Sequence, residues 1–358
     1  MSGMAAGVPR QGGATWVVLQ FVLGLRRLGH EVLLVEEVDD LDRCALYFAA
    51  LVRGFGLDGA LLERSTGRVM GVPSSRLLER ADLLLNISGA LRDEQLLERA
   101  DLRVFVDVDP AFTQLWNEVE GIDFGFDRHH RFVTVGSAIG TDSCAVTTCG
   151  RSWIATRPPI VLEHWPVATR LVHDAATTVG HWRGYGSIVH NGVQYGQRAH
   201  SMRAMFGLTD MTSVRFMLAL AIDPGERADL ASLARHRWGL LDPDRVAGTP
   251  DAYRAFVQGS WAEIGIAKRG YVVSGCGWFS DRSVCYLASG RPVIAQETGW
   301  SRELPTGDGL FSFTTAEEAA AALEEVRCDY PRHRRAAREL AEQLFDSDRV
   351  LSRLLEAV

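Results

Sequence analysis

The stretch GYVVSGCGWFSDRSVCYLASGRPVIAQETGWSRELPTGDG, from Gly270 to Gly309, predicts more of the fold than any other part of the chain. Its opening residues 271–273 are rich in β-forming side chains and indicate a short strand. A polar turn at 280–283 supplies a capping residue for a compact helix at 284–288. Residues 292–295 form the next apolar run. The order strand, turn, helix, strand is typical of a parallel α/β sheet.

The loop after the second run carries backbone amides that suit a diphosphate. Glu297-Thr298-Gly299 and the turn at 304–307 expose amides near a helix start. Together, Ser-Gly-Cys-Gly-Trp-Phe, Tyr-Leu-Ala-Ser-Gly and Gly-Arg-Pro-Val-Ile-Ala resemble, in order and spacing, the C-terminal domain of GT-B glycosyltransferases. The resemblance is to the glycogen-synthase-like group, which uses nucleotide-diphosphate sugars.

The chief departure from that group lies in its donor site. The family's two donor-site glutamates, eight positions apart, fall on Gly277 and Cys285 of this chain. The resemblance otherwise implies two Rossmann-like, doubly wound α/β domains that face a cleft, with a C-terminal helix that crosses back. It also implies a metal-independent sugar transfer, with retention of configuration favoured over inversion.

The composition describes an ordinary globular protein. Its 358 residues are enough for two α/β domains of roughly 150 to 180 residues each. The chain has no membrane-spanning apolar run, and Met1–Gly13 lacks the features of a signal peptide, which predicts a cytoplasmic location. A net charge of -7 argues against a nucleic-acid partner. The six cysteines form no C-x-x-C pair, so we expect reduced thiols and no metal site.

Strand and helix signals alternate in both halves of the chain, which predicts two doubly wound domains. Helices are expected at 15–28, 41–55, 94–99, 194–205, 230–238 and 251–263, and strands at 32–35, 83–87, 104–108, 132–135, 176–180 and 215–221. From residue 316 onward the chain is expected to be helical, with breaks at 330–331 and 345–347.

Proline-rich segments at 156–159 and 165–166 mark a linker between the domains. We therefore predict an acceptor-side domain at residues 1–168, a nucleotide-sugar-binding domain at 169–340 and a C-terminal helix at 341–358. Only residues 1–4 are available for the first strand of the first domain. Either that strand is very short or the chain starts after it.

Gly12 and Gly13 come just before the first expected helix. A glycine pair there lets the backbone approach a sugar or a phosphate closely at a helix N-terminus. The pair also resembles the Gly-rich loop of the GT-B N-terminal domain, so both residues are expected to bind the donor. The alternative is a simple turn. A P-loop is excluded because Gly13 stands where that motif needs lysine.

Three charged residues are expected to be catalytic. Arg183 follows the first strand of the second domain, where open α/β sheets bind ligands, and its planar guanidinium suits a diphosphate. Lys268 would be a second cation on the departing nucleotide, in the role that a divalent metal plays elsewhere. Asp109 ends a strand and is a candidate base for an acceptor hydroxyl. The alternatives are solvent-facing cations and, for Asp109, a turn that begins with Asp-Pro.

The remaining donor-binding candidates lie in two short segments. In Asp281-Arg282-Ser283, the carboxylate can accept hydrogen bonds from sugar or ribose hydroxyls, the guanidinium can pair with a phosphate, and the serine can cap the helix. The alternative is a capping turn alone. In Glu297-Thr298-Gly299, the resemblance implies that the amides face the diphosphate and Glu297 faces the sugar.

We therefore predict a glycosyltransferase that moves a sugar from a nucleotide-diphosphate sugar to a hydroxyl or other nucleophile of a small molecule or glycan. It would need no cofactor beyond this co-substrate. Two alternatives stay open. One is a nucleotide-sugar epimerase with the GT-B fold, and the other is a non-catalytic nucleotide-sugar-binding protein, which the departures at Gly277 and Cys285 permit.

Overall fold

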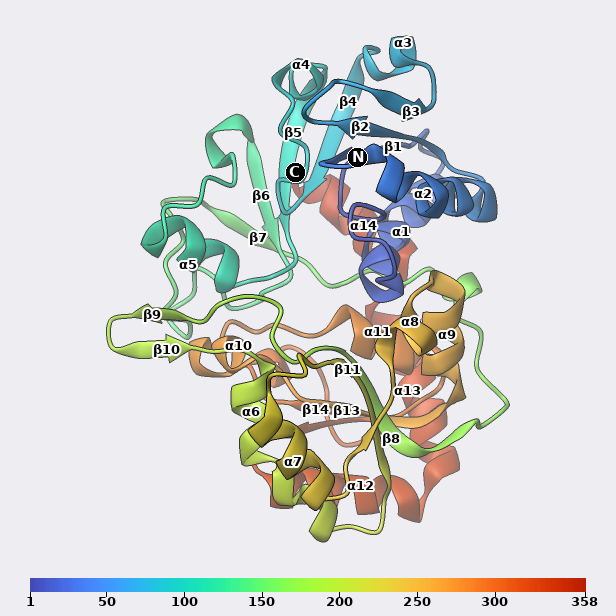
Figure 1. Ribbon diagram of the computed structural model, residues 1–358, viewed down its shortest axis with the longest axis vertical. Helices are drawn as coiled ribbons and strands as arrows, with labels where there is room; N and C mark the ends of the chain where they lie inside the picture. The colour runs from blue at the N-terminus through green and yellow to red at the C-terminus, as the bar shows by residue number, and fades with distance from the viewer.

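Two sheets, one from each half of the chain, organise the molecule (Figure 1). The computed structural model describes all 358 residues. Helices cover both sheets, and the two sheets are stacked one above the other along the long axis of the view. The expectation of two doubly wound α/β units is confirmed. None of the helices combines the length and the apolar character that crossing a bilayer requires.

The first sheet is joined in its middle by the first residues of the chain. Its strands are β1 (Leu33–Val38), β2 (Asp58–Glu63), β3 (Val69–Gly71), β4 (Ala81–Ile87), β5 (Ala100–Asp107), β6 (Arg131–Thr134) and β7 (Trp153–Ala155). Ser2 forms parallel bridges with Val35 of β1 and with Asn86 of β4, so it stands in the place of a central strand. This is the very short first strand that the sequence left open. Only the pair β2–β3 is antiparallel.

The helices of the first half begin and end as their sequence dictates. They are α1 (Gly12–Arg27), α2 (Leu41–Phe55), α3 (Ser74–Leu77), α4 (Glu94–Leu97) and α5 (Phe112–Val119). The α2 helix has the bounds expected from the sequence. The Asp40 side chain caps its first turn by accepting the Arg43 N–H, and Gly56, at φ 59°, ends it in a left-handed conformation.

The second sheet is wholly parallel, in the order β12-β11-β8-β13-β14-β15. Its strands are β8 (His173–His181), β11 (Phe216–Ala221), β12 (Gly239–Leu240), β13 (Ser260–Gly265), β14 (Val293–Gln296) and β15 (Leu310–Phe313). A separate antiparallel hairpin is formed by β9 (Ile188–His190) and β10 (Val193–Tyr195). The strand order reverses between β8 and β13, and ligands of open α/β sheets bind at the carboxyl ends next to such a reversal.

Nine helices belong to the second half of the chain. They are α6 (Arg198–Ala204), α7 (Arg227–Arg235), α8 (Pro243–Ala247), α9 (Pro250–Gly259), α10 (Arg269–Ser274), α11 (Asp281–Ala288), α12 (Ala316–Cys328), α13 (Tyr330–Leu344) and α14 (Ser347–Ala357). The breaks expected at 330–331 and 345–347 are confirmed, because they separate the last three helices.

Two expected elements are wrong, and a third, the helix expected at 194–205, begins only at Arg198 because Val193–Tyr195 form β10. The strand expected at 271–273 lies inside α10, which Gly275 closes at φ 59°. The helix expected at 251–263 stops at Gly259, and the residues that follow form β13. Every residue of β13 is buried between β8 and β14, so the central strand that precedes α11 comes earlier in the chain than expected.

The chain crosses between the two halves twice, and the two crossings lie side by side. The Ile160 N–H donates to Phe345 O at 2.8 Å, and the Ser347 N–H donates to Ile160 O at 2.9 Å. After the second crossing, α14 lies against α1 of the first half, where Arg27 Nε is 3.0 Å from Asp348 Oδ1. The domain bounds of 1–168, 169–340 and 341–358 stay a prediction.

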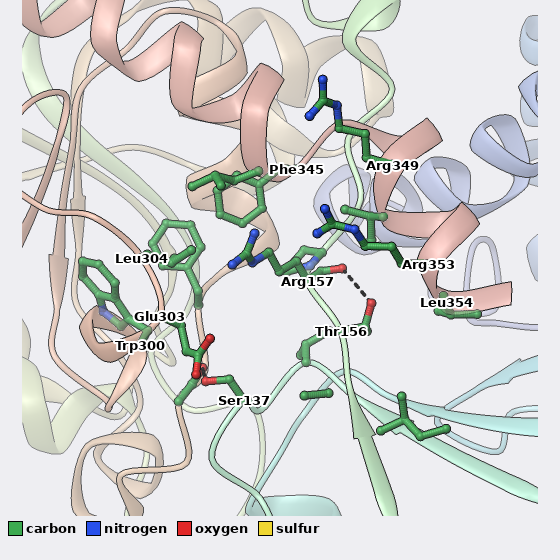
Figure 2. A pocket seen from close by; sticks show the side chains of 18 of the residues that line it. Ser137, Thr156, Arg157, Trp300, Glu303, Leu304, Phe345, Arg349, Arg353 and Leu354 are labelled. Carbon is green, nitrogen blue, oxygen red and sulfur yellow. Dashed lines mark hydrogen bonds between the residues drawn. The ribbon is translucent and has the colours of Figure 1, made fainter. Parts of the chain in front are cut away.

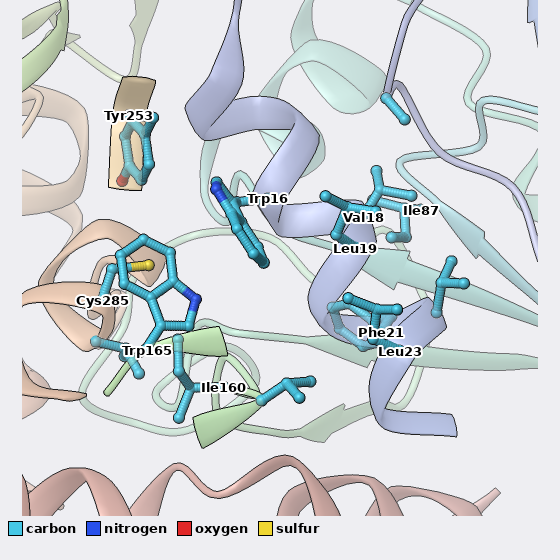
Figure 3. Packing of buried hydrophobic residues seen from close by; sticks show 14 of the residues in the cluster. Trp16, Val18, Leu19, Phe21, Leu23, Ile87, Ile160, Trp165, Tyr253 and Cys285 are labelled. Carbon is cyan, nitrogen blue, oxygen red and sulfur yellow. The ribbon is translucent and has the colours of Figure 1, made fainter. Parts of the chain in front are cut away.

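The largest apolar core of the molecule continues from one half into the other (Figure 3). Trp16 of α1 packs against Trp165 of the first crossing, with ring centroids 5.0 Å apart, and Trp165 in turn packs against Tyr253 of α9. The Trp16 Nε1–H donates to Pro250 O at 2.8 Å. The two halves are therefore held together by buried apolar surface as well as by chain connectivity.

Candidate active site between the two halves

The carboxyl ends of the two sheets face each other. Asp109, which follows β5, meets Lys268, which follows β13, and Gly136, which follows β6, forms a bridge with Trp278. Doubly wound sheets bind their ligands at this edge. The space between the two edges is therefore the candidate active site, and the catalytic candidates Asp109 and Lys268 come together there.

Asp109 is held by three groups from the second half of the chain. Lys268 Nζ lies 3.2 Å from Oδ1 and 3.0 Å from Oδ2, Tyr185 OH donates to Oδ2 at 2.6 Å, and Tyr271 OH donates to Oδ1. The Lys268 ammonium also lies over the ring of Tyr185, 4.3 Å from its centroid. The Asp109 and Lys268 side chains are 24% and 20% exposed. Charge-assisted bonds of this kind fix the carboxylate in one orientation.

The surroundings of this cluster shift the pKa values of its members. Burial lowers the pKa of Lys268, and the adjacent Asp109 carboxylate works against that shift. Burial, followed by the proximity of Asp109, raises the pKa of Tyr185 and of Tyr271 well above the ordinary value. Both phenols are therefore protonated donors near neutral pH. Asp109 can act on an acceptor hydroxyl only when one of its present donors gives way.

Arg198, at the start of α6, is a buried cation at the same strand ends. The sequence analysis did not predict it as a site residue. Its Nε donates to Ile266 O at 2.8 Å and its Nη1 donates to His181 O at 3.1 Å, while no carboxylate pairs with it. Burial, followed by the nearby Arg282, lowers its pKa to about 9. A guanidinium held by two carbonyls without a counter-ion is suited to bind a diphosphate. The feature of the sequence that could have indicated Arg198 as a site residue is its position just after Tyr195-Gly196, near the start of an expected helix.

The structure places the other two predicted arginines in ion pairs. Arg183 pairs with Glu226. Arg282 Nε lies 2.5 Å from Glu263 Oε1 of β13, and Arg282 Nη1 donates to Val179 O of β8 at 3.2 Å. The Glu263 side chain is fully buried and its Oε2 has no hydrogen-bond partner. The charge of Arg282 is therefore neutralised within the fold.

The neighbours of Arg282 on α11 lie in different surroundings. Ser280 caps the helix by accepting the Arg282 N–H, while Ser283 lies within the helix and is buried. Asp281 borders a cavity of about 20 Å³ together with Cys285, and burial raises its pKa. Cys285, at the position of the family's second glutamate, is 3% exposed.

Gly12 and Gly13 contact the second half of the chain. A Cβ on Gly12 would lie 2.3 Å from Thr249 O, and a Cβ on Gly13 would lie 2.9 Å from the Tyr253 ring. Only glycine permits so close an approach of α1 to the start of α9. In this conformation the glycine pair forms part of the contact between the halves.

Glu36, on β1, organises the loop that precedes this pair, and the sequence reasoning missed it. Its carboxylate accepts the backbone N–H groups of Ala5, Ala6 and Gly7 at 3.0, 2.8 and 2.6 Å. Burial raises the pKa of Glu36 to about 7, although these three hydrogen bonds work against the shift. The amides of the Gly-rich loop are therefore satisfied by an internal carboxylate.

Glu297 plays the same part in the loop after β14. Its Oε1 accepts the N–H groups of Thr298 and Gly299 at 3.0 and 2.5 Å, and its Oε2 accepts the Ser312 hydroxyl at 2.6 Å. Burial alone would raise the pKa of Glu297, but the hydrogen bonds from Ser301, Ser312 and Gly299 outweigh it and lower the pKa. The amides expected to face a diphosphate are thus bound to this carboxylate in the present conformation.

Gly277, at the position of the family's first glutamate, has no room for a side chain. Its φ is 75°, and a Cβ there would lie 2.3 Å from Ser137 Oγ and 2.9 Å from Ala138 N. The Ala138 N–H donates to Cys276 O at 3.0 Å. A loop of the first half therefore fills the place that a glutamate side chain would take.

A larger cavity, of about 230 Å³, adjoins Gly277 and Ser137 and is lined by both halves (Figure 2). No group of three or more His, Cys, Asp or Glu side chains is placed to hold a metal ion. The metal independence of the reaction stays a prediction.

Comparison with known proteins rests on structure. No protein-family model matches the chain, and no curated protein is significantly similar in sequence. An α-glucosyltransferase in complex with UDP and a 13-mer DNA containing a central A:G mismatch superposes with a TM-score of 0.63, at 12% identity over 99% of this chain and 98% of that one.

Two further solved structures agree. HepE of Anabaena, in complex with UDP and glucose, gives a TM-score of 0.57 at 11% identity over 98% of this chain and 97% of that one. AviGT4, a glycosyltransferase involved in avilamycin A biosynthesis, gives 0.52 at 15% identity over 97% and 90%. These likenesses confirm the expected GT-B fold.

Proposed function

We propose that the protein is a glycosyltransferase that moves a sugar from a nucleotide-diphosphate sugar to a nucleophile of a small molecule or glycan. The observation that carries the proposal is Arg198, a buried cation without a counter-ion, beside the Asp109–Lys268 pair at the carboxyl ends of both sheets. The structures with UDP or with UDP and glucose bound support a nucleotide-sugar donor for this fold.

The donor diphosphate would bind between Arg198 and Lys268. Arg198 already points its guanidinium at the ends of β8 and β13, and Lys268 follows β13 directly. Cations placed on the leaving nucleotide stabilise the charge that develops as the bond to the sugar breaks. The protein would use them in place of a divalent metal, and Arg183 and the Glu297-Thr298-Gly299 loop would complete the donor site once their present partners release them.

Asp109 would act on the acceptor. When a diphosphate takes over Lys268, the carboxylate loses its cation and can accept a proton from an acceptor hydroxyl. The acceptor oxygen then bonds to the anomeric carbon, the bond from that carbon to the diphosphate breaks, and the proton stays on Asp109. This arrangement gives inversion. With retention, which the sequence resemblance favours, Asp109 would orient the acceptor instead.

One second candidate has a specific observation behind it. Gly277 and Cys285 replace both family glutamates, and Gly277 leaves no room for a side chain. A non-catalytic nucleotide-sugar-binding protein would fit these two replacements. A GT-B-like epimerase remains the other alternative, and it would release nucleotide diphosphate without any acceptor.

The test is binding followed by turnover. UDP, GDP, ADP and TDP sugars are added to the purified chain, and a true donor should raise the melting temperature, because a ligand at 100 times its Kd stabilises the native state by about 2.7 kcal/mol. The stabilising donor is then incubated with an acceptor panel with and without EDTA. Binding of one donor and acceptor-dependent release of its nucleotide support transfer. If no sugar nucleotide raises the melting temperature, the proposal is wrong. Binding without turnover favours the non-catalytic protein.

A further inference from the structure

The cavity of about 230 Å³ lies where the second crossing meets the candidate donor site (Figure 2). Ser137 and Arg157 reach it from the first half and the first crossing, Gly277 and Trp300 from loops of the second half, and Arg353 from α14. The cavity is therefore lined on one side by Trp300, which follows the Glu297-Thr298-Gly299 loop, and on the other by residues of the first half and of the crossings.

The charges around this cavity are unbalanced. Three arginines line it, at positions 157, 349 and 353, against the single carboxylate of Glu303. No carboxylate pairs with any of the three guanidinium groups, whereas Arg27, Arg282 and Arg338 elsewhere form ion pairs. Figure 2 shows the side chains of Arg157 and Arg353 extending the same way, with the guanidinium of Arg353 on the side of Arg157 and that of Arg349 farther out.

Arg157 is the member that the fold constrains most. It is half-buried, and its guanidinium makes no hydrogen bond to the protein. Burial, followed by the proximity of Arg353, lowers its pKa, and Glu303 only partly offsets this. Arg353 itself is exposed, so water screens part of the repulsion between the two like charges, but neither charge has a counter-ion on the protein. An anion bound between them would remove that cost and accept charge-assisted hydrogen bonds from both.

The rest of the lining is apolar. Phe279, Leu304, Phe345 and Leu354 provide hydrocarbon surface next to the arginines. A ligand that fits both parts has an anionic group attached to a partly apolar body. A free inorganic ion would use the arginines and leave the apolar wall uncovered.

We propose that this cavity binds the anionic group of the acceptor, a phosphate or carboxylate on a partly apolar body, through Arg157 and Arg353. The inference rests on the proposed glycosyl transfer. It assigns the anion to the acceptor because Ser137 and Arg157 belong to the side of the cleft opposite Arg198, which is the proposed place of the donor diphosphate. The acceptor nucleophile would then project past Gly277 toward the donor sugar.

Phenyl phosphate serves as the probe, with phenyl β-glucoside as its neutral counterpart. Titration calorimetry and thermal shift on the full chain should show saturable binding of phenyl phosphate and none, or far weaker binding, of the neutral compound. Arg157→Gln and Arg353→Gln should each weaken phenyl phosphate binding about tenfold, the loss of roughly one charge-assisted hydrogen bond. Neither variant should lower the melting temperature of the unliganded protein, because neither guanidinium pairs with the protein.

Arg215→Gln is the matched control, since Arg215 is a surface arginine paired with Asp174, and it should leave binding unchanged. All variants should bind UDP as the parent does. Absence of saturable phenyl phosphate binding, or binding that both cavity variants retain, overturns the proposal. Loss of UDP binding in Arg157→Gln also overturns it, by placing the donor phosphates in this cavity.

A donor-borne anion is distinguished by comparing UDP-glucuronic acid with UDP-glucose. If Arg157→Gln weakens only the former, the anionic group belongs to the donor sugar and the acceptor assignment is wrong. If no sugar nucleotide binds while phenyl phosphate still binds through Arg157, the anion site is supported. Its role in acceptor binding is then rejected, together with the proposed glycosyltransferase activity. The two failures therefore give different results.

Discussion

Lys268 and Asp109 form an ion pair across the two halves of the chain, with the ammonium nitrogen 3.0 and 3.2 Å from the two carboxylate oxygens. In sequence the two residues are 159 positions apart. Both side chains are largely buried, and two tyrosine hydroxyls donate to the same carboxylate. The pair thus fixes how the two sheet edges meet, and it occupies the place where the proposed chemistry must happen.

Asp109→Asn should lower both stability and turnover. Removing the carboxylate leaves the Lys268 ammonium largely buried without a counter-charge, and we expect a loss of about 1–3 kcal/mol in the free energy of unfolding, because breaking a buried pair costs more than breaking an exposed one. Urea denaturation measures it. Asp127→Asn is the control, since Asp127 is 91% exposed in its pair with Arg151 and should change stability by less than about 0.5 kcal/mol. Equal effects of the two substitutions would contradict a buried pair.

Arg198→Gln should weaken nucleotide binding without unfolding the protein. The guanidinium has no carboxylate partner, so its loss leaves no unpaired buried anion, while a diphosphate loses charge-assisted hydrogen bonds. We expect the Kd for the best-binding nucleoside diphosphate to rise about 10- to 100-fold, measured by titration calorimetry. Arg203→Gln, on the same helix but paired with Asp229, should leave that Kd unchanged. A matching loss in both variants would mean that α6 is merely disturbed.

Gly277→Ala should be far more destabilising than a substitution at an open glycine of similar backbone conformation. Both Gly277 and Gly121 have positive φ, 75° and 67°, but only Gly277 has atoms within 4 Å of the added Cβ. We expect a loss of about 1 kcal/mol for Gly121→Ala from the left-handed conformation, and about 3 kcal/mol or more for Gly277→Ala, where Ser137 and Ala138 must move. Chemical denaturation of both variants checks this. Equal losses would show that the loop at 136–138 yields easily.

The stability contribution of Glu36 should fall as pH rises. Its pKa is raised from 4.5 to about 7 in the folded state, so between these values the native protein holds a proton that the unfolded chain has released. The slope of the unfolding free energy with pH is proportional to protons bound in the unfolded state minus those bound in the native state, which is negative here. Stability from this group is full below about pH 4.5 and is lost through about pH 7.

The measurement compares the parent with Glu36→Gln by denaturation at several pH values. The difference in unfolding free energy between them should decline from about pH 4.5 to about pH 7 and level off above it. Using the difference cancels other titrating groups, such as His129, whose pKa burial lowers and which therefore favours stability at higher pH. A difference that rises or stays flat would mean that the three N–H donors keep the Glu36 carboxylate ionised.

Local signals in the sequence predicted those elements whose ends are set by local chemistry. The bounds of α2 follow from a capping Asp40 and a left-handed Gly56, and the division of the last three helices follows from Pro331 and from the polar residues at 346–347. The doubly wound order of both sheets was accessible for the same reason. Strand and helix signals alternate along the chain with short connections.

The misassigned segment at 271–273 shows where local signals fail. Tyr271, Val272 and Val273 favour a strand, yet the central place in the sheet is already taken by β13. Tyr271 is instead buried against Trp278, with ring centroids 4.2 Å apart, while its hydroxyl reaches Asp109. Tertiary contacts to distant residues decided this conformation, and no local propensity encodes them.

For the candidate site, strand-end positions led to Asp109 and Lys268 separately, but not to their pairing. That pairing depends on how two sheets close on each other, which a periodic pattern does not contain. Arg198 and Glu36 were missed because each acts through its burial. The sequence alone does not distinguish a charged side chain that is exposed to water from one that is buried beneath a loop.

The side-by-side crossings near Ile160 and Phe345 limit how the cleft can open. The two backbone hydrogen bonds at Ile160 join the crossings to each other, so a rotation of the halves about these crossings is a motion that would keep both bonds. Displacement in a rotation grows with distance from the axis. In Figure 1 α5 and α10 lie toward the left of the view, α13 lies to the right and α14 lies nearer the middle. In such a rotation the Asp109–Lys268 contact, next to α5 and α10, would move more than the cavity that Arg157 and Arg353 line beside the crossings.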